Sequence, residues 1–201
     1  MATAGRPAAP LLPADAITEL SARTGGGTPR RVLVTVASKH GATREIAQAI
    51  AARLEARGSG GLMAVVLPVE HHPDPRPYDA VVLGSAVYAG RWLEPARAYA
   101  ADHADALRER PVWLFSSGPI GEPPFPPDEP HDAGPLAQVT AARGHHVFPG
   151  RLDKQLLGFG ERAVVTAMRA PVGDFRDWEA VRAWADVIAE ELTAAWSGAP
   201  A

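Results

Sequence analysis

A short apolar run that leads straight into a polar turn and then a helix is the feature that most constrains the fold of this chain. Residues 31–37 read Arg-Val-Leu-Val-Thr-Val-Ala, a β-branched and almost uninterrupted apolar segment. Such a segment suits a strand that is buried on both faces, as in a parallel sheet. After the polar turn at residues 38–43, residues 44–57 place their apolar side chains at helical spacing and stop at Gly58. The first unit is therefore predicted to be strand, tight turn and helix.

The same alternation continues along the chain. Further strands are predicted at residues 62–67, 80–87, 111–116 and 145–148, and further helices at 93–107, 135–143 and 152–168. A last helix begins near Asp174 or Asp177, either of which can cap it, and carries an apolar stripe as far as Leu192. Five strands that alternate with helices predict an α/β fold, a doubly wound five-stranded parallel sheet with helices on both faces.

The ends of the chain differ in composition from its middle. Residues 1–29 are rich in Ala, Pro, Gly and Thr and offer no sustained apolar face. We expect residues 1–29 to be a disordered extension and residues 30–201 to form a single domain.

Composition excludes several classes of function. The 201 residues carry a formal net charge of −3, whereas a nucleic-acid binder needs a basic surface, so no nucleic-acid partner is expected. The absence of cysteine removes disulfides, thiolate catalysis and cysteine-ligated metal sites. No metal site is expected, since adjacent histidines on a strand point to opposite faces. No apolar run approaches the ~20 residues that span a bilayer, so we expect a cytoplasmic protein with at most peripheral contact with the inner face of the membrane.

The turn at residues 38–43 has the composition of a phosphate-binding loop. Glycine allows close backbone approach, hydroxyl groups donate hydrogen bonds, and N–H groups at the start of a helix favour an anion. The turn is not a nucleotide P-loop, which ends in Gly-Lys-Ser or Gly-Lys-Thr, nor a dinucleotide fingerprint, which needs three spaced glycines. The alternative is an ordinary strand-to-helix turn with polar caps. The candidate ligand-binding residues here are Ser38, Lys39, His40, Gly41, Ala42 and Thr43, of which the histidine is either a ligand contact or an exposed bystander.

Two further loops follow the predicted strands at residues 80–87 and 111–116. Their small residues allow a flat ring to approach the backbone, and Tyr88 or Trp92 can stack against it. The alternative is a surface loop whose aromatic side chains pack on the domain. The candidates are Ser85, Ala86, Val87, Tyr88, Ala89, Gly90 and Trp92 in the first loop and Ser116, Ser117 and Gly118 in the second. Since ligands bind outside the carboxyl ends of parallel strands, the three loops together predict a phosphate cradle beside a platform for a planar heterocycle.

These motifs resemble a known family. Ser-Lys-His-Gly-Ala-Thr is similar to the phosphate loop of flavodoxins, which holds the phosphate of FMN, and the predicted fold is flavodoxin-like. The chain most resembles the flavodoxin-domain, quinone-dependent protoporphyrinogen oxidases of bacteria. That resemblance rests on Thr43-Arg44-Glu45, Gly84-Ser85-Ala86-Val87-Tyr88, Phe148-Pro149-Gly150-Arg151-Leu152 and Asp177-Trp178-Glu179. Residues 154–173 depart from it, because they are fewer than in that family and contain only one aromatic residue, Phe159.

The resemblance implies FMN as the cofactor and leaves more than one function open. The first is an FMN-dependent oxidoreductase that passes electrons from a reduced organic substrate, such as protoporphyrinogen, to a quinone-type acceptor. The second is a flavodoxin-type electron carrier between redox protein partners, and the third is a domain that binds FMN or another flat phosphate ligand for regulation. Carriers of this fold usually present an acidic face, whereas Lys39, Arg44 and Arg91 surround the predicted site, which favours the enzyme. The sequence identifies no catalytic base.

Overall fold

The computed structural model describes residues 28–118, 120, 129–167 and 169–197, and its centre is a parallel sheet. The strands lie in the order β2-β1-β3-β5-β6. Their bounds are Arg30–Ala37 for β1, Leu62–Pro68 for β2, Ala80–Tyr88 for β3, Val112–Ser117 for β5 and Gly144–Phe148 for β6. The predicted doubly wound, five-stranded parallel sheet is confirmed. A short strand that the sequence did not predict, β4 (Arg91–Trp92), pairs antiparallel with the end of β3.

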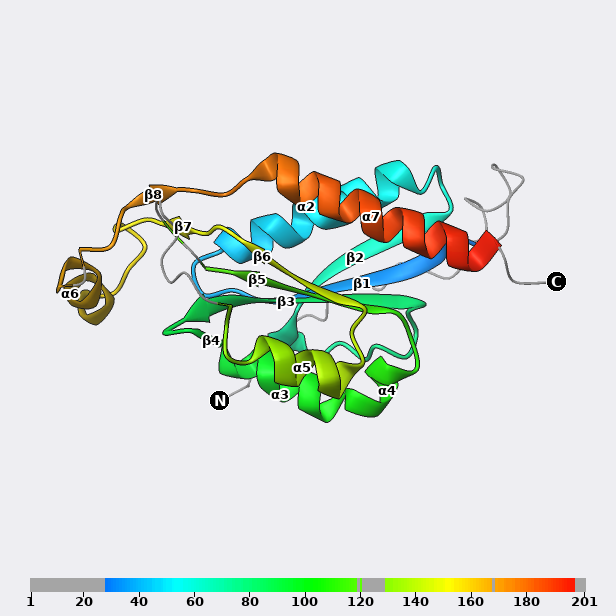
Figure 1. Ribbon diagram of the computed structural model, residues 1–201, viewed down its shortest axis with the longest axis horizontal. Coiled ribbons are helices and arrows are strands. Elements are labelled where there is room, and N and C mark those ends of the chain that lie inside the picture. Colours follow the sequence, from blue (N-terminus) through cyan, green and yellow to red (C-terminus); the bar gives the residue numbers. More distant parts are fainter. Residues whose placement is uncertain (1–27, 119, 121–128, 168, 198–201) are drawn as a thin grey trace, which may run out of the picture.

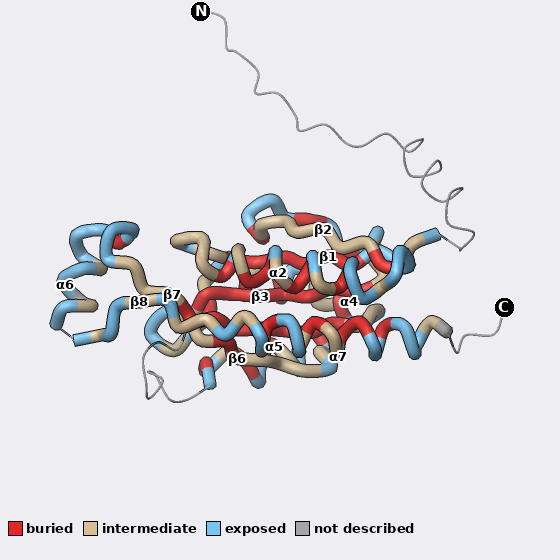
Figure 2. Tube along the Cα trace, turned by 90° about the horizontal axis from the view of Figure 1, so that it is seen from above, coloured by how far each residue is buried: buried red, intermediate tan, exposed pale blue. Residues whose placement is uncertain are grey.

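Helices cover both faces of this sheet (Figure 1). On one face lie α2 (Ala42–Arg57) and α7 (Trp178–Ser197), and on the other lie α3 (Glu94–Asp102), α4 (Ala104–Arg108) and α5 (Ala133–Thr140), while the short 3-10 helix η1 (Val69–His71) follows β2. Successive side chains of a strand point to opposite faces, so Val34 joins the cluster under α2 and α7 while Leu33 joins the cluster on the other side. The central strands are buried along most of their length (Figure 2).

The last helix begins as its sequence predicts. Asp177 is the cap, because its Oδ1 accepts hydrogen bonds from the backbone N–H groups of Glu179 and Ala180, each 2.9 Å long. The apolar stripe of α7 is buried at Val181, Ala185, Ile188 and Leu192. None of the helices that the structure describes is both long and apolar enough to cross a lipid bilayer.

Between β6 and α7 the chain leaves the body of the domain. Two short antiparallel strands, β7 (Arg151–Leu152) and β8 (Gly173–Asp174), form a stem, and α6 (Phe159–Ala167) lies beyond the ends of the sheet strands (Figure 1). We call residues 153–167 the α6 segment.

The predicted helix at residues 152–168 is therefore wrong in its first half. Asp153 starts a turn instead, in which its Oδ1 and its carbonyl oxygen accept hydrogen bonds from the N–H groups of Gln155 and Leu156. Gly158 follows before the helix begins, and Met168 lies outside the described residues.

Other predictions differ less or cannot be compared. The helix predicted at residues 93–107 is divided into α3 and α4 at His103, whose φ of −108° and ψ of 14° leave the helical region. The prediction of a disordered extension over residues 1–29 falls almost wholly outside the described residues.

Candidate functional site

The carboxyl ends of β1 and β3 meet at the point where the strand order of the sheet reverses. From β1 the chain moves outward to β2 on one side, and then to β3, β5 and β6 on the other. Ligands of open α/β sheets bind at such a switch point. The turn at residues 38–43 and the end of β3 flank it.

The turn after β1 leaves the first backbone N–H groups of α2 without a capping side chain among the described residues. Gly41 has φ 86° and ψ −20°, and nothing lies within 4 Å of the position that a Cβ there would take. The N–H of Gly41 donates to Ser38 Oγ over 3.1 Å, which shapes the turn. Within the part of the chain that the structure describes, no side chain caps the first N–H groups of α2, and Thr43 is only 3% exposed beside them. An uncapped helix N-terminus with two hydroxyl groups beside it is suited to an anion.

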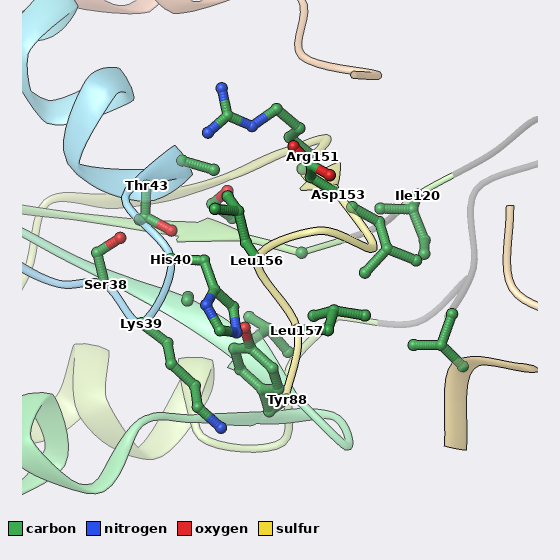
Figure 3. Close-up of a pocket in the computed structure, with 18 of the residues that line it drawn as sticks. Ser38, Lys39, His40, Thr43, Tyr88, Ile120, Arg151, Asp153, Leu156 and Leu157 are labelled. Carbon is green, nitrogen blue, oxygen red and sulfur yellow. The ribbon is translucent and has the colours of Figure 1, made fainter. Parts of the chain in front are cut away.

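Lys39 of this turn lies close to two side chains from other elements, and Figure 3 shows the first of them, Tyr88. Tyr88 ends β3, and the Nζ of Lys39 lies 5.4 Å from the centre of its ring. The same Nζ lies 2.6 Å from Oε1 of Glu161 in α6. Partial burial, and then the Glu161 carboxylate, raise the pKa of Tyr88 to about 12, so its hydroxyl stays protonated at neutral pH.

The site is a cavity of about 210 Å³ that four parts of the chain enclose (Figure 3). The turn after β1 and the end of β3 form two sides, the end of β5 forms a third, and the stem and α6 segment close the fourth. The lining residues are Ser38, Lys39, His40, Ala42, Thr43, Ala86, Val87, Tyr88, Ala89, Ser117, Gly118, Ile120, Gly150, Arg151, Leu152, Asp153, Leu156, Leu157, Val165 and Ala170.

Comparison with known proteins agrees with this geometry. A family profile described as a flavodoxin domain matches residues 33–178. The chain belongs to the flavodoxin-domain family. No curated protein matches the chain.

Solved structures show the same fold at low sequence identity. A flavodoxin from the domain Archaea is 12% identical with a TM-score of 0.57, covering 81% of this chain and 99% of its own. The rubredoxin oxygen:oxidoreductase of Desulfovibrio gigas is 12% identical with a TM-score of 0.56, covering 83% of this chain and 37% of its own. A structure titled flavone reductase is 10% identical with a TM-score of 0.51, covering 80% and 62% respectively. At these identities the likeness shows the fold alone.

Most of the ligand-binding residues predicted from the sequence line the cavity, but five do not. Eleven lie in its wall, five of them from the turn after β1. The exceptions are Gly41, Ser85, Gly90, Trp92 and Ser116. Gly41 still shapes the wall, because it sets the turn from which its neighbours reach the cavity.

The prediction that Trp92 can stack against a flat ligand is wrong. Trp92 is only 2% exposed and belongs to the core on the α3 side of the sheet. Its Nε1–H donates to Ser116 Oγ over 2.7 Å, and its backbone N–H donates to Asp132. Ser85 is buried as well, since its hydroxyl donates to the Ala86 carbonyl and accepts from the Leu93 N–H. The hairpin between β3 and β4 turns these residues inward, which leaves Tyr88 as the aromatic side chain of this loop at the cavity.

The residues that the sequence missed come mostly from the stem and the α6 segment. The apolar ones are Leu152, Leu156, Leu157, Val165, Ala170 and, from the chain after β5, Ile120. The others are Gly150, Arg151 and Asp153. A signal was available, because the 29 residues between Phe148 and Trp178 far exceed the usual length of a strand-to-helix connection. Loops of that length without a packing role are commonly functional.

Two adjacent histidines of β6 face opposite sides of the sheet, as the strand geometry predicts. His145 Nε2 lies 2.7 Å from Ser116 Oγ, and its Nδ1 lies 4.0 Å from Glu129. His146 packs on Phe148 and Trp184 on the other side. Burial lowers the pKa of both imidazoles. Among the described residues, no group of three or more His, Asp or Glu side chains could hold a metal ion.

Proposed function

We propose that this chain is an FMN-dependent oxidoreductase that passes electrons from a reduced organic substrate to a quinone-type acceptor. One observation carries the proposal: an uncapped helix N-terminus and a half-buried tyrosine share a single cavity at the switch point of a flavodoxin fold. The first suits a phosphate and the second suits a flat ring.

The residues fit FMN part by part. The N–H groups at the start of α2, with the hydroxyl groups of Ser38 and Thr43, would hold the phosphate. Ala86 and Gly118 are small enough for a flat ring to lie against the backbone, and Tyr88 would stack beside it. When bound, the flavin supplies the redox chemistry, and the protein sets its exposure and surrounding charge.

The composition of the cavity favours a small substrate over a docked protein. Leu156, Leu157 and Val165 of the α6 segment form an apolar side of the cavity, where a planar organic molecule can lie out of water. The polar part of the cavity carries both signs of charge, since Lys39 and Arg151 line it together with Asp153, whereas carriers of this fold present an acidic face. Protoporphyrinogen, a puckered and largely apolar macrocycle, is the substrate that the resemblance suggests, and a quinone-type molecule is a flat, apolar acceptor that suits this side of the cavity.

A flavodoxin-type electron carrier is the second candidate. Tyr88 is 40% exposed, so a ring stacked on it keeps an edge open to a redox protein partner.

Cofactor binding is tested with two single variants of the apoprotein. A hydrogen bond to a charged group is worth about 1.5–3 kcal/mol, so Ser38→Ala and Thr43→Ala are each expected to weaken FMN binding about tenfold or more. Riboflavin lacks the phosphate and serves as the control, with unchanged affinity. Calorimetry that finds FMN affinity intact in both variants would contradict the assignment of the phosphate loop.

The reaction is tested with the flavin-loaded protein and small molecules only. Each two-electron oxidation of a porphyrinogen or similar substrate should reduce one soluble menaquinone analogue to its hydroquinone, with steady turnover and no protein partner. Absence of turnover with any quinone, together with rapid electron exchange with a flavodoxin reductase, would assign the chain to the carriers instead.

A further inference from the structure

The cavity is small for its proposed ligand. Its volume of about 210 Å³ lies below the roughly 300–1,000 Å³ that pockets for ligands of cofactor size provide. The α6 segment lines one side of it with Leu156, Leu157 and Val165, of which Figure 3 shows Leu156 and Leu157. Outward movement of part of the wall would make room for a flavin.

The α6 segment is the part of the wall that is least tied to the body. Of its side chains that the structure describes, only Leu157 is buried, and Phe159 is 93% exposed. Among the described residues, the strands that join it to the body are β7 and β8, which pair with each other over two residues each and not with the main sheet. The other sides of the cavity are the turn after β1, the ends of β3 and β5 and Ile120, and of these the strands are fixed by the core.

Two charged contacts fasten the start of α6 to the turn after β1. Oε1 of Glu161 lies 2.6 Å from Lys39 Nζ and 3.2 Å from His40 Nε2. Its other oxygen, Oε2, accepts the Gly158 N–H over 2.8 Å, which holds the carboxylate in place at the start of α6. Lys39, then the Gly158 N–H and His40, lower the pKa of Glu161 to about 2, so the carboxylate is ionised throughout the neutral range.

We propose that the α6 segment is a lid that opens about its stem to admit the cofactor, and that Glu161 is the latch that holds the lid shut through Lys39 and His40. This inference rests on the proposed flavin-binding function. The latch is ionic and its groups are partly exposed, with Lys39 49% and Glu161 25% exposed, so salt weakens it. The closed state lowers the apparent association rate, because only the open fraction can bind.

The decisive probe is riboflavin, which carries no charge, so that salt acts on the protein alone. In stopped-flow mixing with the apoprotein, Glu161→Gln is expected to speed riboflavin association about fivefold or more. Raising the salt concentration should speed association to the wild-type protein toward the same value and leave the variant nearly unchanged. Glu190→Gln is the matched control, because it removes the same charge from a side chain that is 69% exposed and pairs with Arg57, away from the cavity.

A second measurement needs no flavin. Amide hydrogen exchange of α6 in the apoprotein should become faster in Glu161→Gln and also in Lys39→Met, which breaks the same contact from the other side without altering α6 itself. Equal riboflavin association rates and equal α6 exchange in the wild-type protein and the Glu161 variant would overturn the latch. If no flavin binds to any form, the proposed function fails, and the exchange experiment alone then decides whether the latch exists.

Discussion

The body of the domain and the α6 segment are held in place by different forces. In the body, Phe148 is fully buried and packs against Phe115, His146 and Trp184. In the α6 segment, Phe159 is 93% exposed, and the closest ties to the body are the contacts of one carboxylate. Apolar burial therefore fixes the sheet and its helices, whereas charge fixes the segment that closes the cavity. The same kind of substitution should therefore change the stability of the protein by very different amounts in the two regions.

The two phenylalanines provide the largest contrast. Phe148→Ala should destabilise the protein by about 3–5 kcal/mol, because it leaves a cavity in the core. Phe159→Ala should change the free energy of unfolding by less than about 0.5 kcal/mol, as expected for an exposed side chain. Denaturant unfolding of both variants measures this, and similar losses would show that the α6 segment packs on the body.

Two glycines repeat the test in the opposite sense, by adding a methyl group. A Cβ at Gly84 in β3 would overlap the ring of Phe115, so Gly84→Ala should cost about 1–3 kcal/mol. Gly160 in α6 has no atom within 4 Å of that position, and alanine is the better helix former by about 0.5–1 kcal/mol. Gly160→Ala should thus leave the midpoint of thermal unfolding unchanged or raise it. A loss at Gly160 as large as that at Gly84 would refute the contrast.

Acid should affect the body before it affects the latch. His145 and His146 have pKa values below the usual 6.5, so the unfolded chain binds their protons first and stability falls as the pH drops below about 6.5. The slope is at most about 1.4 kcal/mol per pH unit for each histidine. The depressed pKa of Glu161 means that its contribution is complete above its ordinary pKa near 4.5 and is lost only as the pH falls toward 2.

Thermal unfolding between pH 7.5 and 5.5 tests this order. The wild-type protein should lose stability over this range, and His145→Gln should lose less. The groups that face His145 are Glu129, which opposes the shift, and Ser116, while His146 on the other face of the sheet adds to the shift as a neighbouring charge. If the stability of the wild-type protein does not change between pH 7.5 and 5.5, the two histidines do not control it. If amide exchange in α6 already becomes faster at pH 5.5, the ionisation of Glu161 does not explain the latch.

The smallest effect is expected at the stem. Glu45 of α2 contacts Arg176 at 2.7 Å and Arg151 at 3.3 Å, and the Arg176 side chain is only 3% exposed. Glu45→Gln should reduce overall stability by about 1 kcal/mol or less, since partly exposed ion pairs are weak, yet it should speed amide exchange in β7 and β8. Glu190→Gln is again the control. Unchanged exchange in the stem would show that Glu45 does not restrain it.

The same difference explains how much could be predicted from sequence. Strands β1, β3 and β5 are buried on both faces, so their apolar runs stand out, and the sheet with its helices follows from their order. The turn at residues 38–43 could be predicted because the unpaired N–H groups at a helix start attract an anion and because glycine adopts the positive φ that the turn requires. Trp92 was predicted to lie at the ligand, but it is in the core. The sequence alone does not distinguish the two environments, because the β3–β4 hairpin that buries the side chain is not apparent from it.

The α6 segment could not be derived in this way. Its apolar residues at positions 157, 164, 165 and 168 resemble one side of a helix that packs on a sheet, but in the structure Leu157 and Val165 face the cavity instead. The contact between Lys39 and Glu161 joins residues that lie more than a hundred positions apart, and no local pattern encodes such a pair.

Glu45 of α2 pairs with Arg151 in β7 and with Arg176, which follows β8, and these contacts divide the scaffold of the domain from the segment that closes the cavity. Both ends of the excursion are pinned to α2, so its interior can lengthen, shorten or change in sequence without disturbing the register of the sheet. Evolution can therefore change the residues that close the cavity while the sheet and its helices stay the same. Grafting a different segment between Leu152 and Gly173 should redesign the selectivity of the site while the scaffold beneath it stays the same.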